Sequence, residues 1–358
     1  MLRRHLFQWD TSRLFARTRY AAALVMPRRA RWAQAAAQRA IVPPATAAAA
    51  PGTEGATRLL LIRPDYFAVN EAAVKTNAFM HRPFLECPKA RQEAAEMRER
   101  ALREHADLAG TLHDHGFETY VVSGIPDAPD AVFCNNPVSV HHAWETADGQ
   151  SRIVLYPMSL PNRRIEIREE INDLLRAVNP TAKIVDLRGA FACMYLEGTG
   201  SLVLDRAHRV AFAALSPRTY LMKVRQFATS MAYTPIIFHA HLNGTPVYHT
   251  NVVVALGRKW CVVALECIAQ AEHPAILKHA EITGRQVIDI TAFQVKKYCA
   301  NILEITNARG QTYTLMSTGA RDAFTADQLA ALEPVIAVDL KTIEKYGGGS
   351  ARCCVCEI

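Results

Sequence analysis

The feature that most constrains the fold is a repeated helix–strand pair that begins near residue 58. An amphipathic helical pattern followed by a short β-rich strand pattern recurs five times. The expected helices are Lys89–His115, Arg163–Val178, Pro217–Ala232, Pro274–Thr283 and Ala326–Leu332, and the expected strands are Thr119–Gly124, Lys183–Leu187, Pro235–His239, Gln286–Ile290 and Pro334–Leu340. The strand centres lie about 64, 51, 51 and 49 residues apart, and five similar units predict a closed circular array rather than two domains.

A second strand pattern in each unit shows the same period. Each of these strands opens on polar residues, in the segments Phe133–Asn136, Leu196–Thr199, Tyr248–Asn251, Ala300–Ile302 and Arg352–Cys353. Equivalent positions in these segments recur after about 61, 52, 52 and 52 residues. Units stacked around an axis present equivalent positions to a shared centre, so we expect these polar residues to meet there.

The residues expected at this centre carry the chemistry of covalent catalysis. They are Cys353, His249, Glu197, Asn136, Asn251 and Asn301. A thiol and an imidazole are the usual pair of nucleophile and proton shuttle. A buried carboxylate binds an N–H-rich group through charge-assisted hydrogen bonds. The backbone of Gly347–Gly349, just before the thiol, is free of Cβ atoms and offers N–H groups to a tetrahedral intermediate.

Each of these residues also has a structural interpretation. Glu197 with Gly198 is compatible with a tight turn, and His249 with a hydrogen-bonded core histidine. Asparagine generally favours turns and caps. Arg218 lies where a helix is expected to begin and would then face solvent, and the group Arg163, Arg164 and Glu166 is typical of an ion-pair cluster on a helix surface.

Charge is concentrated in the first part of the chain. Residues 1–53 hold nine arginines, no lysine and one acid, which gives +8, so residues 54–358 sum to −1. The body therefore does not predict a nucleic-acid surface. An Arg- and Ala-rich, acid-poor leader followed by a Pro- and Ala-rich linker is typical of a mitochondrial transit peptide, with a disordered extension as the alternative. We expect residues 1–57 to be leader and linker and residues 58–358 to form one catalytic domain.

Cysteine usage and hydropathy limit the environment further. The nine cysteines are odd in number and scattered, which favours reduced thiols over a disulfide framework. Cys353 and Cys356 have the spacing of a CxxC pair, but no second pair with that spacing occurs, so a structural zinc site is not expected. No stretch approaches the roughly 18 apolar residues of a membrane-spanning helix, so we expect no membrane partner.

Several motifs taken together resemble those of the guanidino-group-modifying enzymes, which include arginine and agmatine deiminases, dimethylarginine hydrolases and amidinotransferases. The motifs are Leu61-Ile62-Arg63-Pro64, Val132-Phe133-Cys134-Asn135-Asn136, Tyr156-Pro157-Met158, Asn162-Arg163-Arg164, Leu196-Glu197-Gly198-Thr199-Gly200-Ser201, His249-Thr250-Asn251 and Gly347-Gly348-Gly349-Ser350-Ala351-Arg352-Cys353. The branch they resemble most is that of the citrulline utilization hydrolases. The resemblance covers residues 58–358 and implies a five-bladed α/β propeller (pentein) with pseudo-fivefold repeats.

The resemblance also implies roles for individual residues. Cys353 would be the nucleophile, His249 the acid and base, and Glu197 the carboxylate that binds the terminal nitrogens of the substrate. Arg218 matches an arginine that holds the amino-acid carboxylate in the deiminases. No metal and no organic cofactor is implied, and the partner is a small ureido or guanidino amino acid. The sequence leaves open whether the chain forms a homo-oligomer.

Two positions depart from the deiminase pattern. Asn136 and Asn251 stand where deiminases have aspartates. An unpaired buried cation costs several kcal/mol, so the loss of two carboxylates favours a neutral ureido group over a guanidinium. The sequence therefore predicts hydrolysis of citrulline or a similar compound through an S-carbamoyl enzyme. Arginine-type deimination and amidino transfer are the alternatives on the same site, and a non-catalytic binding protein on the five-bladed fold is the alternative from another class.

Overall fold

The computed structural model describes residues 57–74, 76–80, 90–189 and 193–358. The predicted leader therefore lies outside the described residues, apart from residue 57. Within the described part, most strands belong to five three-stranded sheets. These are β17 (Cys356–Glu357), β1 (Arg58–Arg63) and β2 (Glu118–Ser123); β3 (Val138–His141), β4 (Arg152–Leu155) and β5 (Lys183–Asp186); β6 (Val203–Asp205), β7 (Val210–Ala214) and β8 (Thr234–Phe238); β11 (Val254–Leu256), β12 (Trp260–Val263) and β13 (Gln286–Asp289); β14 (Leu303–Thr306), β15 (Thr312–Ser317) and β16 (Val335–Val338).

Every one of these sheets has the same internal pattern. Its first two strands pair antiparallel and its last two pair parallel. A parallel pair needs a crossover connection, and a helical segment supplies it each time. The described helices are α2 (Glu71–Val74), α3 (Ala90–Asp114), α4 (Pro161–Arg164), α5 (Glu169–Val178), α6 (Gly198–Ser201), α7 (Leu221–Met231), α8 (His273–Ile282), α9 (Ala292–Lys296), α10 (Thr318–Ala323), α11 (Ala326–Ala330) and α12 (Lys341–Gly347). The described residues also form short 3₁₀ helices and a small antiparallel pair of strands. The 3₁₀ helices are η1 (Ala143–Glu145), η2 (Thr250–Val252), η3 (Leu265–Cys267) and η4 (Gln270–Glu272), and the pair is β9 (His241–Leu242) with β10 (Thr245–Pro246).

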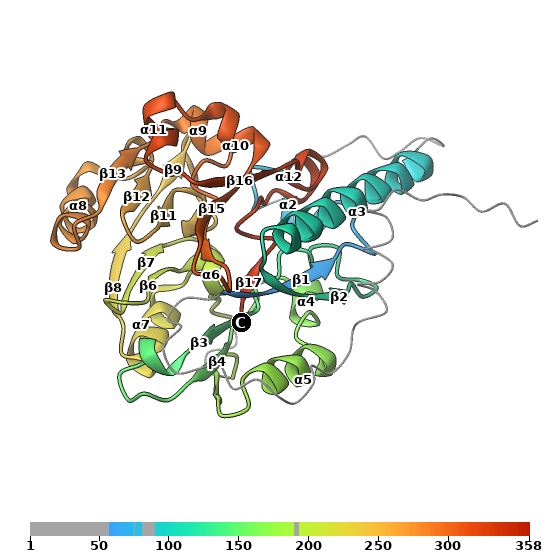
Figure 1. Cartoon of the computed structure of the whole chain (residues 1–358), viewed down its shortest axis with the longest axis horizontal. Helices are drawn as coiled ribbons and strands as arrows, with labels where there is room; N and C mark the ends of the chain where they lie inside the picture. The colour runs from blue at the N-terminus through green and yellow to red at the C-terminus, as the bar shows by residue number, and fades with distance from the viewer. Residues whose placement is uncertain (1–56, 75, 81–89, 190–192) are drawn as a thin grey trace, which may run out of the picture.

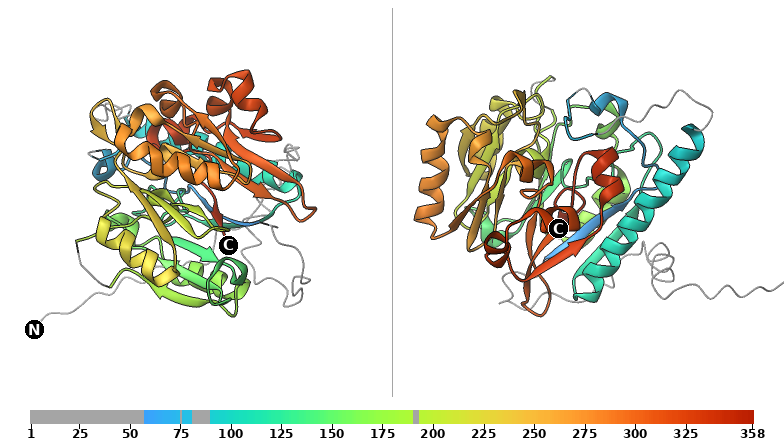
Figure 2. Two further views of the ribbon diagram at one scale, coloured as in Figure 1. Left: turned by 90° about the vertical axis from the view of Figure 1, so that its left-hand side faces the viewer. Right: turned by 90° about the horizontal axis from the view of Figure 1, so that it is seen from above.

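The sheets are arranged around the centre of the molecule, and α3, α5, α7 and α8 lie at its outer edge (Figure 1). Neighbouring sheets touch: β17 contacts β3, β6 contacts β11, β11 contacts β14, and α3 packs against both β1 and β16. Seen from above, α3 and α8 lie on opposite sides with strands between them (Figure 2). The architecture is therefore a propeller-like α/β arrangement with the helices outside.

The middle strands explain where the core sits. β12 (Trp260–Val263) is buried throughout, and β7 (Val210–Ala214) is buried except at its first residue. A strand with a neighbour on each side and side chains packed on both faces reads as a continuous apolar run. The core lies between each sheet and its covering helix and between adjacent sheets.

The five expected strands are confirmed as β2, β5, β8, β13 and β16, within two residues at most ends. Two expected helices are wrong in extent. The helix expected at Arg163–Val178 is two separate helices, because α4 ends at Arg164 and α5 begins at Glu169. The helix expected from Pro217 begins at Leu221, because a turn at Ser216–Thr219 precedes it. In both places an arginine side chain points into the protein, as described below.

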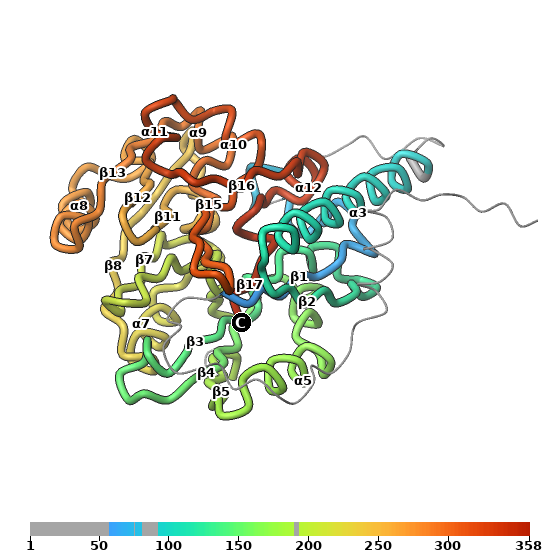
Figure 3. Tube along the Cα trace, in the orientation of Figure 1, coloured from blue at the N-terminus to red at the C-terminus, as the bar shows by residue number. Residues whose placement is uncertain are grey.

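The two ends of the described chain meet in one sheet. Leu60 of β1 pairs with Cys356 of β17, and the N–H of Ile358 donates to the carbonyl of Arg58 at 2.9 Å. The tube in Figure 3 shows the final residues running beside β1. This pairing holds the segment that carries Cys353 against the first sheet.

Candidate active site

Glu197 lies at the centre of a buried charged cluster. It immediately precedes α6, and its side chain is fully buried. Its Oε2 atom lies 2.8 Å from Nε2 of His249 and 3.5 Å from Nη1 of Arg218. Its Oε1 atom accepts the backbone N–H of Ser159 at 3.0 Å. The structure thus brings together the predicted carboxylate, imidazole and Arg218, and Arg218 is buried rather than solvent-facing.

These contacts set the charge of each group. Burial by itself would raise the pKa of Glu197, but the charge of Arg218 and the hydrogen bond from His249 hold that pKa well below its usual range. Burial lowers the pKa of His249 to about 4, against the opposing effect of Glu197. At neutral pH the imidazole is therefore uncharged. Because Nε2 faces a carboxylate, it carries the proton, and Nδ1 keeps a free lone pair that can accept one.

Two glycines of α6 make room for this arrangement. Gly198 has a φ of +45°, and a Cβ there would lie 2.4 Å from the carbonyl oxygen of Asn136. A Cβ on Gly200 would lie 2.7 Å from Nδ1 of His249 and 2.3 Å from Nδ2 of Asn136. The Glu-Gly-Thr-Gly sequence is thus a steric requirement for placing the imidazole against α6.

Cys353 lies in the turn that leads into β17 and is buried. Its Sγ atom lies 3.2 Å from Nδ2 of Asn301 and 3.5 Å from Nδ2 of Asn251. The neighbouring thiols have other environments: burial raises the pKa of Cys354 and of Cys356, and the Cys356 thiol is directed at the carbonyl of Val138. Of these three thiols, Cys353 is therefore the one that faces the polar centre.

Two contacts join the thiol to the Glu197 cluster. Asn251 donates from Nδ2 to the carbonyl of Thr199 at 3.2 Å as well as to Cys353, and it is two residues from His249. The Tyr248 ring lies 4.6 Å from the His249 ring, and its hydroxyl donates to the carbonyl of Gly348 in the glycine run before Cys353. The repeat spacing therefore brought together residues that are more than 150 positions apart.

Asn136 has both ends of its amide engaged by the protein. Its Oδ1 accepts from Nη1 of Arg163 at 2.8 Å, and its Nδ2 donates to the carbonyl of Glu197 at 3.4 Å. Arg163 also forms a two-point ion pair with Glu166 at 2.7 and 2.9 Å. The interpretation of Arg163 and Glu166 as a helix-surface pair is wrong, because both side chains are buried. Arg164 alone of that group reaches the surface.

Several buried polar atoms in this region have no hydrogen-bond partner in the described structure. They are Oδ1 of Asp130, Oδ1 of Asn251, Nε of Arg218 and both amide atoms of Asn135. Burial raises the pKa of Asp130, while Arg163 and the hydrogen bond from Asn70 oppose that shift. Unpaired buried polar atoms are costly, so their concentration here marks where a ligand's polar groups would bind.

Asp130 and Arg163 extend the site beyond the predicted residues, whereas Asn301, which was expected at the centre, lies beside the Cys353 sulfur. Asp130 had no sequence signal, since it lies in an Asp- and Pro-containing stretch that reads as a loop. Asn301 was expected at the centre because it falls at an equivalent position of the repeat. Arg163 lies in a pattern that is typical of a surface helix, so nothing in the sequence indicated that its side chain is buried.

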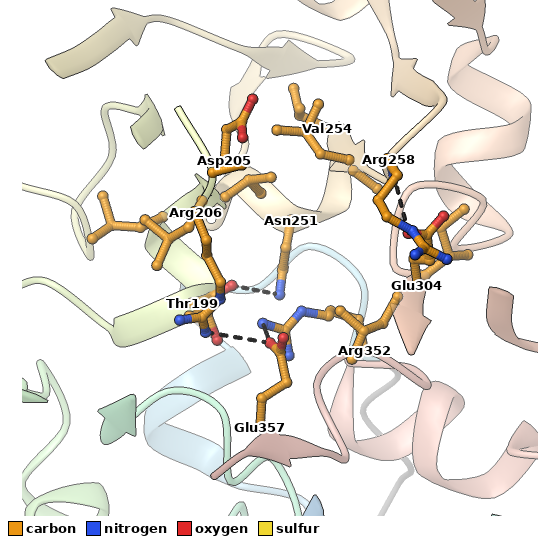
Figure 4. Close-up of a pocket in the computed structure, with 18 of the residues that line it drawn as sticks. Thr199, Asp205, Arg206, Asn251, Val254, Arg258, Glu304, Arg352 and Glu357 are labelled. Atoms are coloured by element: carbon orange, nitrogen blue, oxygen red, sulfur yellow. Dashed lines mark hydrogen bonds and ion pairs between the residues drawn. The ribbon is translucent and has the colours of Figure 1, made fainter. Parts of the chain in front are cut away.

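A cavity of about 560 Å³ lies next to this cluster, between β6, β11 and β14 (Figure 4). Its lining includes Thr199 and Asn251 but neither Cys353 nor His249. Its charged side chains are paired with one another, for example Arg352 with Glu357 and Arg258 with Glu304. The lining holds four arginines and three acids, so its net charge is small.

Two further features concern only the described residues. In that part of the chain, no group of three or more His, Cys, Asp and Glu side chains is placed to hold a metal ion. No helix there has both the length and the apolar character that crossing a bilayer requires.

The sequence model of one protein family matches residues 63–358 of the chain. It describes the eukaryotic N,N dimethylarginine dimethylhydrolases. This protein belongs to that family. The expected membership of the guanidino-group-modifying superfamily is thereby confirmed. The family consists of hydrolases that act on C–N bonds within the amidinotransferase superfamily.

Solved structures with the same fold come from related enzymes. An arginine dihydrolase of the cyanobacterial ornithine–ammonia cycle, ArgZ, superposes with a TM-score of 0.63 at 17% identity, covering 84% of this chain and 40% of that one. Its N-terminal domain, bound to product, gives a TM-score of 0.63 at 17% identity and covers 97% of that domain. DDAH from Pseudomonas aeruginosa, in complex with citrulline, gives 0.58 at 16% identity, covering 85% of this chain and 100% of that one. No curated protein matches. Because the sequence identities are this low, these structures are evidence for the fold of this chain and not for its substrate.

Proposed function

We propose that this family member is a cysteine-dependent hydrolase of a ureido amino acid, most simply citrulline. Cys353 is the nucleophile, His249 the acid and base, and Glu197 the carboxylate that orients the imidazole and binds substrate N–H groups. The proposal is supported by the hydrogen bond between His249 and Glu197, and by Asn251, which contacts both the Cys353 sulfur and the carbonyl of Thr199, two residues after Glu197. A binding protein would have no need of such a set.

The observation that carries the substrate choice is the charge of the cluster. Arg163 and Arg218 bring two positive charges, Asn136 and Asn251 bring none to offset them, and we assign the nearby Asp130 to the α-ammonium of the substrate. Glu166 is already committed to Arg163 and Glu197 to Arg218. A guanidinium beside these arginines would be a poorly compensated buried cation, which costs several kcal/mol, whereas a ureido group adds no charge.

The reaction proceeds in two steps. Neutral His249 takes the thiol proton of Cys353 as the sulfur attacks the ureido carbon, and the imidazolium gives that proton to the leaving amine as the C–N bond breaks. His249, neutral again, then takes a proton from water as the water attacks the S-carbamoyl carbon. The C–S bond breaks, the imidazolium returns its proton to the sulfur, and carbamic acid leaves and ionises to carbamate. Glu197 stabilises the imidazolium each time it forms.

The unpartnered polar atoms suggest how the amino-acid end is held. Nε of Arg218 is a free donor for the α-carboxylate, in line with its expected role, and Oδ1 of Asp130 is a free acceptor for the α-ammonium. Oδ1 of Asn251, beside the sulfur, is an acceptor for a ureido N–H. A substrate with these three groups would satisfy buried atoms that otherwise remain unpaired.

Hydrolysis of dimethylarginine is the second candidate, and the family match favours it. It would use the same nucleophile and base but would place a guanidinium against Arg163 and Arg218. Arginine deimination and amidino transfer to an acceptor amine are further variants of the same covalent chemistry.

A substrate screen distinguishes these reactions. The full chain is incubated with citrulline, arginine, dimethylarginine and agmatine, and separately with arginine plus glycine, and ammonia, dimethylamine and amino-acid products are measured. We expect ornithine and ammonia from citrulline, with Cys353→Ser inactive because a serine hydroxyl ionises far less than a thiol. Efficient turnover of dimethylarginine or arginine, with little on citrulline, would exclude the ureido assignment.

We infer in addition that the propeller-like arrangement is five-bladed with pseudo-fivefold repeats. Five three-stranded sheets of one internal pattern, and a period near 52 residues in the polar segments, support this inference. Residues 58–358 would then be one catalytic domain. Import into the mitochondrial matrix is proposed from the arginine-rich leader, and a fluorescent fusion to residues 1–57 that stays outside mitochondria would contradict it.

A further inference from the structure

The sulfur of Cys353 is held by two neutral amides. In the described part of the chain, its hydrogen-bond partners are Nδ2 of Asn301 at 3.2 Å and Nδ2 of Asn251 at 3.5 Å. Asn301 is completely buried and lies between α9 and β14, on the sheet adjacent to that of Asn251. We call Asn251 and Asn301 the amide pair.

Backbone contacts determine which end of each amide faces the sulfur. Oδ1 of Asn301 accepts the N–H groups of Ser350 at 3.2 Å and of Cys353 at 3.3 Å, and these groups can only donate. Its Nδ2 must therefore be the atom at the sulfur, and it also lies 3.2 Å from the carbonyl of Asn251. Nδ2 of Asn251 is fixed in the same way by the carbonyl of Thr199. Both amides thus present N–H groups to Sγ.

The charged groups nearby do not replace this interaction. Burial lowers the pKa of His249 to about 4, so there is no imidazolium at neutral pH to pair with a thiolate. The guanidinium of Arg352, the residue next to the thiol, donates instead to the carbonyl of Val355 and to Glu357. Arg218 is committed to Glu197 and Thr76.

The other titratable neighbours bring no positive charge to the sulfur. Burial raises the pKa of Tyr248, Tyr298 and Cys354, each of which interacts electrostatically with Cys353. Burial also raises the pKa of Glu344, which accepts a hydrogen bond from Ser350. Glu197 stays ionised, and as an anion it disfavours a thiolate. N–H donors are thus the groups here that favour the charged sulfur.

We propose that Asn301 is a catalytic residue: together with Asn251 it stabilises Cys353 as a thiolate and aims its lone pair at the substrate carbon. The S–H bond breaks, its proton goes to water or to Nδ1 of His249, and the electron pair stays on sulfur. A thiolate is a much stronger hydrogen-bond acceptor than a thiol, so the amide pair favours the ionised form. This inference rests on Cys353 being the nucleophile and does not depend on which ureido or guanidino compound is used.

The test is Asn301→Asp. The carboxylate still accepts the N–H groups of Ser350 and Cys353, but an oxygen replaces the donor that faces the sulfur. The rate of iodoacetamide alkylation at Cys353 is followed by peptide mapping across the neutral pH range, with no substrate present. We expect the midpoint of the pH profile to move upward and alkylation at pH 7 to fall about tenfold or more, the effect of losing a hydrogen bond to a charged group. The kcat should fall by more than KM rises.

Asn307→Asp is the matched control. Asn307 is buried in the same sheet, its Oδ1 also accepts two backbone N–H groups, from Arg309 and Gln311, and its Nδ2 donates to a backbone carbonyl rather than to the sulfur. It should alter stability like Asn301→Asp but leave the alkylation profile unchanged. Asn251→Ala, which removes the other donor, should also move the profile upward even if Asn301→Asp fails to fold.

An unchanged alkylation profile in folded Asn301→Asp, or in Asn251→Ala if the first variant does not fold, would overturn the inference. That result is independent of the substrate screen, because alkylation requires only the free enzyme. Failure of the proposed substrate would in turn leave the alkylation result standing.

Discussion

At the scale of single residues, the charge of Glu197 supports both His249 and Arg218. In Glu197→Gln the shape is kept, but the imidazolium that forms during turnover loses its counter-charge and Arg218 loses its ion partner. We expect kcat to fall by roughly 10²- to 10⁴-fold, the range for acid–base groups. Steady-state kinetics on the substrate identified by the screen measures this, and circular dichroism checks the fold.

Glu145→Gln provides the control for that substitution. Glu145 is buried and, like Glu197, contacts a histidine and an arginine: His141 at 3.4 Å and Arg206 at 2.7 Å. Neither of these partners belongs to the candidate active site. Its loss should lower stability and leave kcat nearly unchanged. Equal losses of kcat in both variants would show that the effect of Glu197 is structural rather than catalytic.

The candidate site shows what sequence reasoning can reach at this scale. Cys353, His249 and Glu197 were placed together because their spacing follows the repeat, which is a global constraint. Arg163 was missed because Arg and Glu three positions apart have the same pattern on a helix surface and in a buried pair. Only the break between α4 and α5, which tertiary packing produces, turns Arg163 inward.

At the scale of elements, α3 buries a histidine that has no partner at Nε2. Burial lowers the pKa of His105 to about 4. The unfolded chain binds a proton near pH 6.5 and the native protein does not, so stability is lost as the pH falls from about 6.5 to 4. His105→Leu should reduce the slope of unfolding free energy against pH by up to about 1.4 kcal/mol per pH unit in this window. Urea unfolding at several pH values measures it.

His113→Leu, at an exposed position of the same helix, is the comparison. It controls for the exchange of a histidine for a leucine on α3 itself. If His105→Leu leaves the slope at its wild-type value, the native pKa of His105 is not depressed and the burial argument for α3 is incorrect.

The element boundaries also separate local from tertiary information. The outer strands β2, β5, β8, β13 and β16 follow their helices with β-branched runs, so local pattern was sufficient to predict them. The start of α7 could not be predicted from the local sequence pattern. It follows the turn at Ser216–Thr219, and Arg218 in that turn makes a tertiary contact with Glu197. Residues 198–201 are a short helix rather than the opening of a strand, since two glycines allow α6 to approach Asn136 and His249.

At the scale of the whole molecule, the first and last described strands belong to the same sheet. The sequence predicted a closed array from the repeat period, and the pairing of β1 with β17 brings the two ends of the described chain side by side. The sequence could not predict that β17 would be only two residues long, because so short a strand has no periodic pattern. Its stability comes from the residues packed around it.

Ile358 is the side chain whose substitution tests how much this pairing of the chain ends contributes to stability. It is 1% exposed, it packs with Leu60 and Val138 in one core cluster, and its N–H bonds to Arg58. Ile358→Ala should lower the free energy of unfolding by about 2–5 kcal/mol, as buried large-to-small substitutions do. Ile282→Ala, at a position 70% exposed on α8, should change it by less than about 0.5 kcal/mol. Both are measured by urea unfolding, and an equally small effect at Ile358 would mean that the pairing of the chain ends contributes little to stability.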